Sequence, residues 1–424
     1  MKTKGIAGGI LLAGFVTGAA FQAFADGEAP HSRFWANRAE LFAVPKSWPA
    51  EGAVSGPVPE GLRAAFLEGL PFKGHATRFF VYWGVPAGAR ATNAVPGMVL
   101  VHGGGGSAFA NWVKFWNDRG YAAISMDLNG RVSGDLGNTS HVRHAWAGPG
   151  AVGCGGFDLL KERPEDQWMY HAVADVVKSH SFLRAQPGVD PDRIGMTGVS
   201  WGGVVNCVVA SVDDRFRFAI PVYGCGFLFE PFSSWTHRYG GMDAKVTRKR
   251  KKGWSPLWDP MNYLPLAKIP VHWLNGTNDG NFSLPSLQAS YDLVPTEKSL
   301  SLRVRMGHSH GKVSEQAIEV VSYADALLKG APALPKVGRP VLSGGCLSAS
   351  FSQDDRLPVA SAVLDFTADD SFCWYSNRWK SVSAQVSGGR AWAAVPPMAK
   401  WAYLSVKTTN AAVVSSSVLD LRKP

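Results

Sequence analysis

The hydrophobic positions of the chain follow two different patterns, which change over near residue 330. Before that point, short apolar runs typical of buried parallel strands alternate with segments whose apolar residues recur at helical spacing. The expected strands are 62–67, 78–83, 95–101, 121–128, 193–197, 217–223, 269–274 and 300–306, and the expected helices are 108–119, 164–183, 203–212 and 313–328. This alternation predicts a mostly parallel sheet with helices on both faces.

Beyond residue 330 the helical period is lost. Pro332 and Pro335 follow the last helical segment, and short alternating segments at 357–366, 374–380, 391–395 and 401–406 predict the strands of a small β-sandwich. We therefore expect four parts after a leader. They are an N-terminal arm at 26–59, an α/β catalytic domain at 60–330, a lid-like insertion within it at 224–263, and an all-β accessory domain at 331–424.

The first 25 residues carry the pattern of a targeting segment. Lys2 and Lys4 precede a short apolar run, and the sequence at 23–25 is a small-residue cleavage signal. This pattern predicts a signal peptide at 1–25 and export to the periplasm or the extracellular space. The alternative is an N-terminal membrane anchor, although the apolar run is shorter than the roughly 18 residues that a spanning helix needs. We expect no stable membrane insertion after cleavage.

Composition and charge limit the classes of molecule that we expect this protein to bind. With 424 residues, 46% of them hydrophobic, the chain can bury a large core. Its formal net charge is +10, but basic residues are dense only at 245–252, which we interpret as a solvated loop and not as a nucleic-acid or membrane surface. The cysteines are too scattered for a disulfide scaffold, although Cys346 and Cys373 are candidates for one bridge. No Cys/His spacing resembles a metal site, so we expect no metal.

Ser200 is the candidate nucleophile. It lies in a G-x-S-x-G motif, Gly198 to Gly202, between the expected strand at 193–197 and the expected helix at 203–212. This motif presents a serine on a strained turn between a strand and a helix, and the glycines let the two elements approach closely. With 47 glycines in the chain the motif alone decides little, so the prediction depends on the flanking elements.

A run of glycines supplies a second candidate feature. His102 ends an expected buried strand and is followed by four glycines at 103–106. Backbone N–H groups of such a loop can approach a developing oxyanion, so we expect one donor from Gly104 or Gly105 and a second from Trp201, the residue after the nucleophile. The alternatives are a flexible turn or a phosphate-binding loop, but the spacing of a nucleotide-binding motif is absent.

An acid and two histidines follow the last two expected strands of the catalytic region. Asp279 comes after the strand at 269–274, and His308 and His310 come after the final one. A serine hydroxyl becomes nucleophilic when an imidazole takes its proton and a carboxylate orients that imidazole. We prefer His308 as the base because it lies closer to the strand end, and His310 would then line the pocket or contact the lid. Asp279 has the alternative of being only a turn residue.

These motifs resemble the exported acetylxylan-esterase-like branch of the dienelactone-hydrolase-related α/β hydrolases. The resemblance spans about residues 57 to 330 and is carried by Trp112 and by the segments 102–106, 119–123, 192–195, 198–203, 221–226, 275–279 and 306–310. It implies the α/β-hydrolase fold and a serine esterase acting on acyl groups of plant or algal carbohydrate, without metal or organic cofactor. The chain departs from the family at 307–310, where Gly-His-Ser-His replaces the usual Pro-His-Gly-His, and at Gly280-Asn281, where the family has bulkier residues.

Two other functions remain open. A prolyl-oligopeptidase-type peptidase shares the triad, but it normally carries a large preceding domain, for which 26–59 is too short. A non-catalytic polysaccharide-binding protein on a hydrolase scaffold would suit the 16 tryptophans, whose rings stack on sugars. If the protein is an esterase, the expected partner is an acylated carbohydrate or another small ester, with no nucleic acid; the oligomeric state is not indicated.

Overall fold

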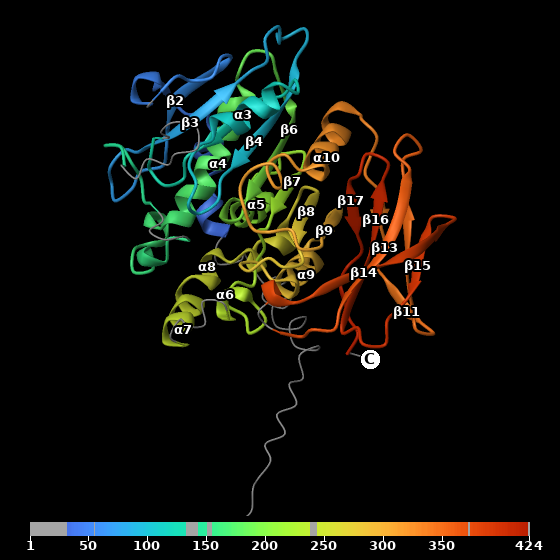
Figure 1. The fold of residues 1–424 in the computed structure, drawn as a ribbon. Coiled ribbons are helices and arrows are strands. Elements are labelled where there is room, and N and C mark those ends of the chain that lie inside the picture. Colours follow the sequence, from blue (N-terminus) through green and yellow to red (C-terminus); the bar gives the residue numbers. More distant parts are fainter. Residues whose placement is uncertain are drawn as a thin grey trace, which may run out of the picture.

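Two β-sheets organise the part of the chain that the structure describes, which comprises residues 32–54, 56–132, 143–150, 155–237, 244–371 and 374–422. In this computed structural model the first sheet is mostly parallel and carries helices, and the second is antiparallel and lies beside it at the C-terminal end of the chain (Figure 1). The expected α/β-hydrolase fold with an additional all-β region is confirmed. The predicted signal peptide, Cys154 and Cys373 lie outside the described residues.

The first sheet has nine strands in the order β1-β2-β3-β5-β4-β6-β7-β8-β9. Neighbouring strands are antiparallel from β1 to β5 along this order and parallel from β5 to β9. Strands β5, β7 and β8 are buried at every residue, as expected for a sheet covered on both faces. The strands are Ser47–Pro49 (β1), Leu62–Glu68 (β2), Arg78–Gly84 (β3), Val95–Val101 (β4), Ala122–Met126 (β5), Val189–Val199 (β6), Ala219–Val222 (β7), Val271–Gly276 (β8) and Lys298–Arg303 (β9).

The helices of the catalytic region pack on this sheet. They are α3 (Ala110–Asn117), α4 (Trp168–Arg184), α5 (Trp201–Val212), α9 (Leu284–Leu293) and α10 (Ile318–Lys329). Helices α4 and α5 pack on each other, and α10 packs on β6 and β8. Apolar spacing predicts all of them except α9. The predicted helix at 164–183 begins later, since Pro164–Asp166 forms a separate 3₁₀ turn (η4).

The expected N-terminal arm contributes structure to the catalytic region. A 3₁₀ turn, Ser32–Trp35 (η1), and a short helix, Arg38–Phe42 (α2), precede β1, which extends the sheet by pairing with β2. The ring of Phe34 stacks on Trp258 at 5.5 Å, and that of Trp35 on Tyr170 at 5.2 Å. The arm is therefore held by aromatic packing.

The insertion after β7 is helical. It contains α6 (Ser234–His237), α7 (Ala244–Gly253) and α8 (Ser255–Trp258), which group at the lower left of Figure 1, together with the 3₁₀ turns Pro260–Asn262 (η5) and Leu264–Leu266 (η6). The basic run at 245–252, interpreted from the sequence as a loop, is instead part of α7, because long unbranched basic side chains favour helix. One of its cations, Lys251, pairs with Glu230 at 2.8 Å.

The second sheet folds over on itself. Its strand order is β10-β12-β15-β14-β13-β16-β17, with β11 on β12 and β18 on β16. Strand β14 pairs first with β13 and then with β15, so the sheet encloses a small apolar cluster of its own, consistent with the sandwich-like expectation. The strands are Lys336–Val337 (β10), Val341–Ser343 (β11), Cys346–Ser352 (β12), Val359–Thr367 (β13), Trp379–Ser387 (β14), Arg390–Ala394 (β15), Trp401–Thr408 (β16), Val413–Ser415 (β17) and Leu419–Asp420 (β18).

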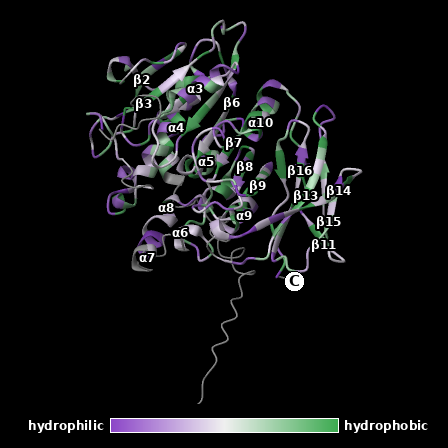
Figure 2. Cartoon of the chain, viewed as in Figure 1, coloured by the Kyte–Doolittle hydropathy of each residue, from purple (hydrophilic) through white to green (hydrophobic). Residues whose placement is uncertain are grey.

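The strand predicted at 374–380 is wrong in its first half, because Trp374–Ser376 forms a 3₁₀ turn (η7) before β14 begins. The sequence pattern does not predict strands β10, β11, β12, β17 and β18. Figure 2 shows hydrophobic residues on strands of both sheets, and this pattern makes most strands of the catalytic region recognisable from the sequence.

The second sheet covers the edge of the first. Backbone N–H of Leu302 on β9 donates to Ser415 Oγ on β17 at 3.1 Å, and Ser301 Oγ donates to Val413 O at 2.5 Å. The buried carboxylate of Glu319 on α10 accepts from Val413 N at 3.0 Å and forms an ion pair with Arg303 of β9. The second sheet therefore contacts the edge of β9 at Ser301 and Leu302, which leaves less of that edge free to pair with other chains.

Cys207, Cys225 and Cys346 are free thiols. Cys373, the other member of the bridge considered from the sequence, lies outside the described residues. Within the described ranges no helix combines the length and apolar character needed to cross a membrane.

Candidate active site

Ser200 occupies the turn between β6 and α5 with φ of 60° and ψ of −118°, a backbone conformation that non-glycine residues rarely adopt. The positions two residues before and after the serine must be glycine because neighbouring backbone atoms leave no room for a side chain. A Cβ on Gly198 would lie 2.4 Å from Gly202 O, and a Cβ on Gly202 would lie 2.1 Å from Val101 O. Backbone therefore touches backbone on both sides of the serine, which holds the strained turn in place.

Ser200 is joined by hydrogen bonds to one of the two predicted histidines and, through it, to the predicted acid. Ser200 Oγ lies 2.9 Å from His308 Nε2, and His308 Nδ1 lies 2.7 Å from Asp279 Oδ2. A carboxylate on Nδ1 fixes the tautomer in which Nε2 is unprotonated and able to accept the serine proton. The structure thus brings together three side chains from the ends of three different strands.

Asp279 is buried, with 1% of its surface exposed. Its second oxygen, Oδ1, accepts from the backbone N–H of Asn281 at 2.7 Å and of Phe282 at 2.8 Å. Both carboxylate oxygens are therefore engaged, and the orientation of the side chain toward His308 is set by its own loop. Asp279 therefore bonds His308 in addition to shaping its own turn.

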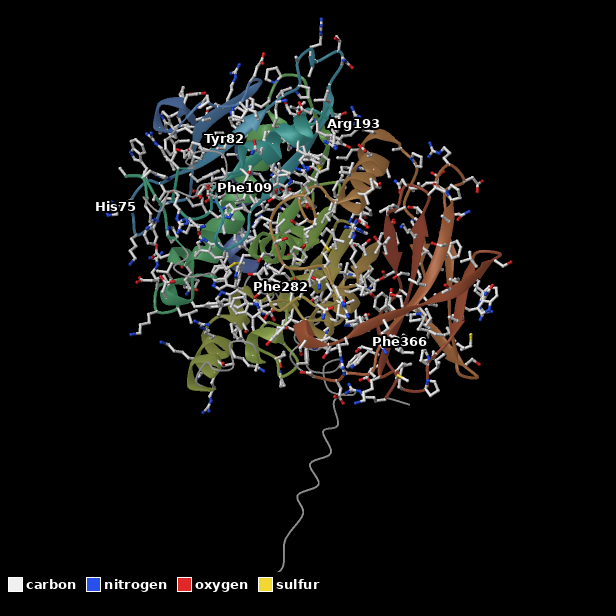
Figure 3. The ribbon with its side chains drawn as sticks, viewed as in Figure 1. His75, Tyr82, Phe109, Arg193, Phe282 and Phe366 are labelled. Carbon is white, nitrogen blue, oxygen red and sulfur yellow. The ribbon has the colours of Figure 1, made fainter. Side chains whose placement is uncertain are left out.

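His308 is held between two aromatic rings. The ring of Tyr223 lies 4.8 Å from it and that of Phe282, labelled in Figure 3, lies 5.9 Å from it. Tyr223 Oη donates to Gly307 O at 2.9 Å, and burial raises the pKa of its phenol, so the hydroxyl keeps its proton for this bond. The sequence analysis gives neither ring a role, although Tyr223 lies in the segment 221–226 that carries the family resemblance.

His310 has a different partner. Its Nδ1 lies 2.8 Å from Glu315 Oε1, and its ring packs 5.3 Å from that of Phe109. Its Nε2 faces the glycine loop, since a Cβ placed on Gly103 would lie 2.8 Å from His310 Nε2 and 3.0 Å from Ser200 Cβ. His310 therefore lines the site next to the serine without being the ring that bonds it.

The glycine loop is anchored by a neutral histidine. His102 is 1% exposed, and burial lowers its pKa to about 3. Its Nε2 lies 2.9 Å from the N–H of Leu128, which must donate, so Nε2 is the acceptor and Nδ1 carries the proton that it shares with Gly103 O at 2.6 Å. His102 thereby orients the first peptide of the loop.

The expected oxyanion donors belong to the glycine loop and to the start of α5. Gly104 and Gly105 form the turn of the loop, and Asn129 Nδ2 supports it by donating to Gly106 O at 3.1 Å. Trp201 is the first residue of α5, where backbone N–H groups have no acceptor within the helix. These N–H groups remain our expectation for the oxyanion pocket. Asn129 was not recognised from the sequence.

The insertion contacts the residue after the serine through an aromatic cluster. The ring of Trp201 lies 5.4 Å from that of Trp235, 5.9 Å from Trp254 and 5.8 Å from Phe157. Arg250 of α7 places its guanidinium 4.4 Å from the Phe157 ring centre. The predicted lid-like segment thus packs directly beside the nucleophile turn.

Two further buried histidines, His272 and His171, lie outside the candidate triad. Burial lowers the pKa of His272 to about 3 and that of His171 to about 4, so both rings are neutral near pH 7. In the described part of the chain, no group of three or more His, Cys, Asp or Glu side chains is placed to hold a metal ion.

Two family models match parts of the chain that carry this site. The acetyl xylan esterase (AXE1) family model matches residues 72–233, which include the glycine loop and Ser200. The prolyl oligopeptidase family model (Peptidase_S9) matches residues 159–328, which include Ser200, Asp279 and both histidines.

Solved structures share the fold. An acetyl xylan esterase from Paenibacillus sp. R4 has a TM-score of 0.52 and 20% identity, over 72% of this chain and 96% of that one. Acetyl xylan esterase 1 from Thermoanaerobacterium sp. JW/SL YS485 has a TM-score of 0.50 and 16% identity, over 68% and 92%.

A curated relative, thiohydrolase aneE from Aspergillus aculeatus, is 42% identical over 50 residues, which are 12% of this chain and 16% of that protein's length. This match is too short to carry an activity. The family matches and the fold confirm the resemblance expected from the sequence. The chain is an α/β hydrolase and an acetylxylan-esterase-like serine hydrolase of the carboxylic ester hydrolase class.

Proposed function

We propose that this protein is an exported serine esterase that hydrolyses acyl esters, acetyl esters foremost, on carbohydrate. Ser200 is the nucleophile, His308 the general base and Asp279 the acid that orients it. The observation that carries the proposal is the continuous hydrogen-bond chain through these side chains, 2.9 Å from Ser200 Oγ to His308 Nε2 and 2.7 Å from His308 Nδ1 to Asp279 Oδ2.

The geometry supports a two-step reaction. His308 Nε2 takes the proton of Ser200 Oγ as the oxygen attacks the ester carbonyl, and the N–H groups of Trp201 and of Gly104 or Gly105 stabilise the oxyanion. His308 then protonates the departing alcohol, leaving an acyl group on Ser200. In the second step His308 deprotonates a water molecule, which attacks the acyl group and releases the acid and the free serine.

The acetyl group and the carbohydrate are supported by the acetyl xylan esterase family match and by the two acetyl xylan esterase structures that share the fold. Export is supported by the basic, apolar and small-residue pattern of residues 1–25. We propose the periplasm or the extracellular space as the location.

The test is acetate release from acetylated xylan and hydrolysis of 4-nitrophenyl acetate. Both activities should vanish in Ser200→Ala, and a fluorophosphonate probe should label the wild type but not this variant. Ser211→Ala, on the same helix with its hydroxyl bonded to Val208 O, is the matched control and should behave as the wild type. Undiminished acetate release by Ser200→Ala would overturn the proposal, and an unlabelled wild type would favour a sugar-binding protein on an inactive scaffold.

One observation favours a second candidate. The prolyl oligopeptidase family match covers all three proposed catalytic residues. A peptidase would cleave proline-containing peptide 4-nitroanilides with a kcat/KM above that for acetyl esters, whereas the esterase should show the reverse order.

A further inference from the structure

A turn of the C-terminal sheet is bonded directly to the loop that carries Asp279. Asn278, the residue before the acid, points its Nδ2 at three backbone carbonyls of that turn. The distances are 2.7 Å to Asn377 O, 3.0 Å to Tyr375 O and 3.4 Å to Trp374 O. An amide nitrogen has two protons, so the two shorter contacts use its full donor capacity.

The same amide also links the acid loop to the histidine loop. Asn278 Oδ1 accepts from Thr277 Oγ1 at 2.9 Å, and Thr277 Oγ1 in turn accepts from the N–H of Arg305 at 3.0 Å. Arg305 lies just before His308 in the chain. One buried hydroxyl and one amide therefore connect the loop of the acid, the loop of the base and the turn of the second sheet.

The turn that receives Asn278 is itself anchored. Trp374 is 3% exposed, contacts the ring of Trp401 edge-on at 5.3 Å, and belongs to the same apolar cluster as the catalytic sheet. Asn377 N donates to Trp374 O at 3.2 Å, which closes the turn. In Figure 1 this turn, η7, is the orange-red coil beside α9, away from the strands of its own sheet.

We propose that the C-terminal domain is part of the catalytic machinery, and that Asn278 is a positioning residue through which the η7 turn holds Asp279 against His308. This inference rests on the proposed function, in which Asp279 orients the base. The physical reason is that a displacement of a catalytic group by about 1 Å can cost about 10²-fold in rate. Asp279 sits on a loop, and the bonds from Asn278 to η7 tie that loop to a turn that the buried side chain of Trp374 anchors.

The experiment replaces Asn278 in the full chain. Asn278→Ala removes the donor, and Asn278→Asp keeps the shape but presents oxygens to three carbonyls. We expect kcat on 4-nitrophenyl acetate to fall by about 10- to 100-fold in both variants, with KM changed by less than about 2-fold. The matched control is Ser322→Ala, which removes another contact between the two regions, Asn410 Nδ2 to Ser322 Oγ at 3.1 Å, and should keep the wild-type kcat.

A double-mutant cycle separates positioning from general loss of stability. If Asn278 acts through Asp279, then Asn278→Ala should change the rate of fluorophosphonate labelling of Ser200 by less than about 2-fold in an Asp279→Asn background. An equal loss in both backgrounds, or an unchanged kcat in both Asn278 variants, overturns the inference. The labelling rate reads serine reactivity without any natural substrate, so a wild type that labels but releases no acetate contradicts the proposed substrate alone.

Discussion

Glu315 holds His310 through a 2.8 Å contact from Oε1 to Nδ1, while the neighbouring His308 bonds Ser200 and Asp279. The two imidazoles of one loop thus have separate carboxylates and separate positions. We predict that His308→Ala lowers kcat on 4-nitrophenyl acetate by about 10²–10⁴-fold, the range contributed by a general base. His310→Ala should cost no more than about 10-fold, because its ring lines the pocket. An inactive His310→Ala beside an active His308→Ala would reverse the assignment.

A second prediction concerns Gly103, where a larger residue should reduce activity. A methyl group there would meet His310 Nε2 at 2.8 Å and Ser200 Cβ at 3.0 Å, so Gly103→Ala must displace the glycine loop or the groups that face it. We expect kcat to fall by about 10²-fold, as when an oxyanion donor is lost. In a His310→Ala background part of this loss should be recovered, because one of the clashing groups is gone. Gly52→Ala, where a Cβ meets nothing within 4 Å, is the control, and equal losses in both glycine variants would refute the steric argument.

The stability of the protein should depend on pH through His272. It is fully buried, its Nδ1 lies 2.7 Å from Ser299 Oγ, and burial lowers its pKa from 6.5 to about 3. Between these values the unfolded chain binds a proton that the folded chain does not. The contribution of this group to stability is therefore complete above pH 6.5 and is lost as the pH falls toward 3.

The variant His272→Gln removes this proton uptake. The slope of the free energy of unfolding against pH, measured by urea denaturation between about pH 6 and 4, should become less steep by up to about 1.4 kcal/mol per pH unit. The same slope in the variant and the wild type would contradict the prediction. Activity per folded molecule at pH 7 should be unchanged, since the hydrogen-bond partners of the His272 ring are Ser299 and Ser301 of β9 and not the catalytic side chains.

Replacing Asp213, which follows the C-terminal end of α5, should lower the stability of the protein through lost buried contacts. Its buried carboxylate accepts from His180 Nδ1 at 2.9 Å and from Arg215 Nη2 at 2.7 Å. Asp213→Ala leaves both groups without their acceptor and should lower the free energy of unfolding by about 3–5 kcal/mol. The neighbouring Asp214, whose ion pairs are exposed, is the control, and Asp214→Ala should cost less than about 1 kcal/mol. Similar losses in the two variants would contradict this account.

The parts of the fold that sequence predicted are those where one physical constraint acts on many residues. Strand β4 has the predicted bounds, Val95–Val101, because a strand buried on both faces must be apolar throughout. The turn at Ser200 was predictable because a side chain on Gly198 or Gly202 would collide with backbone, its Cβ lying only 2.4 Å or 2.1 Å from a carbonyl oxygen, so no other residue fits.

The parts that sequence did not predict depend on contacts between distant segments. Trp374 looked like the start of a strand, since a buried turn and a strand share an apolar pattern. The bond from Asn278 to Asn377 O in the same turn joins residues 99 positions apart, and no motif signals it. The sequence analysis also does not identify Glu315 as the partner of His310. The contact between them depends on how the loop between these two residues folds, which the sequence pattern does not indicate.

The carboxylate of Glu319 links the two sheets, because it binds both Arg303 on the last parallel strand and the N–H of Val413 in the second sheet. A shortened version ending after α10 would leave that buried charge with half of its partners and an unprotected row of backbone donors and acceptors along β9. Such a fragment should self-associate. Deleting the second sheet to obtain a smaller enzyme should therefore lower stability and solubility together.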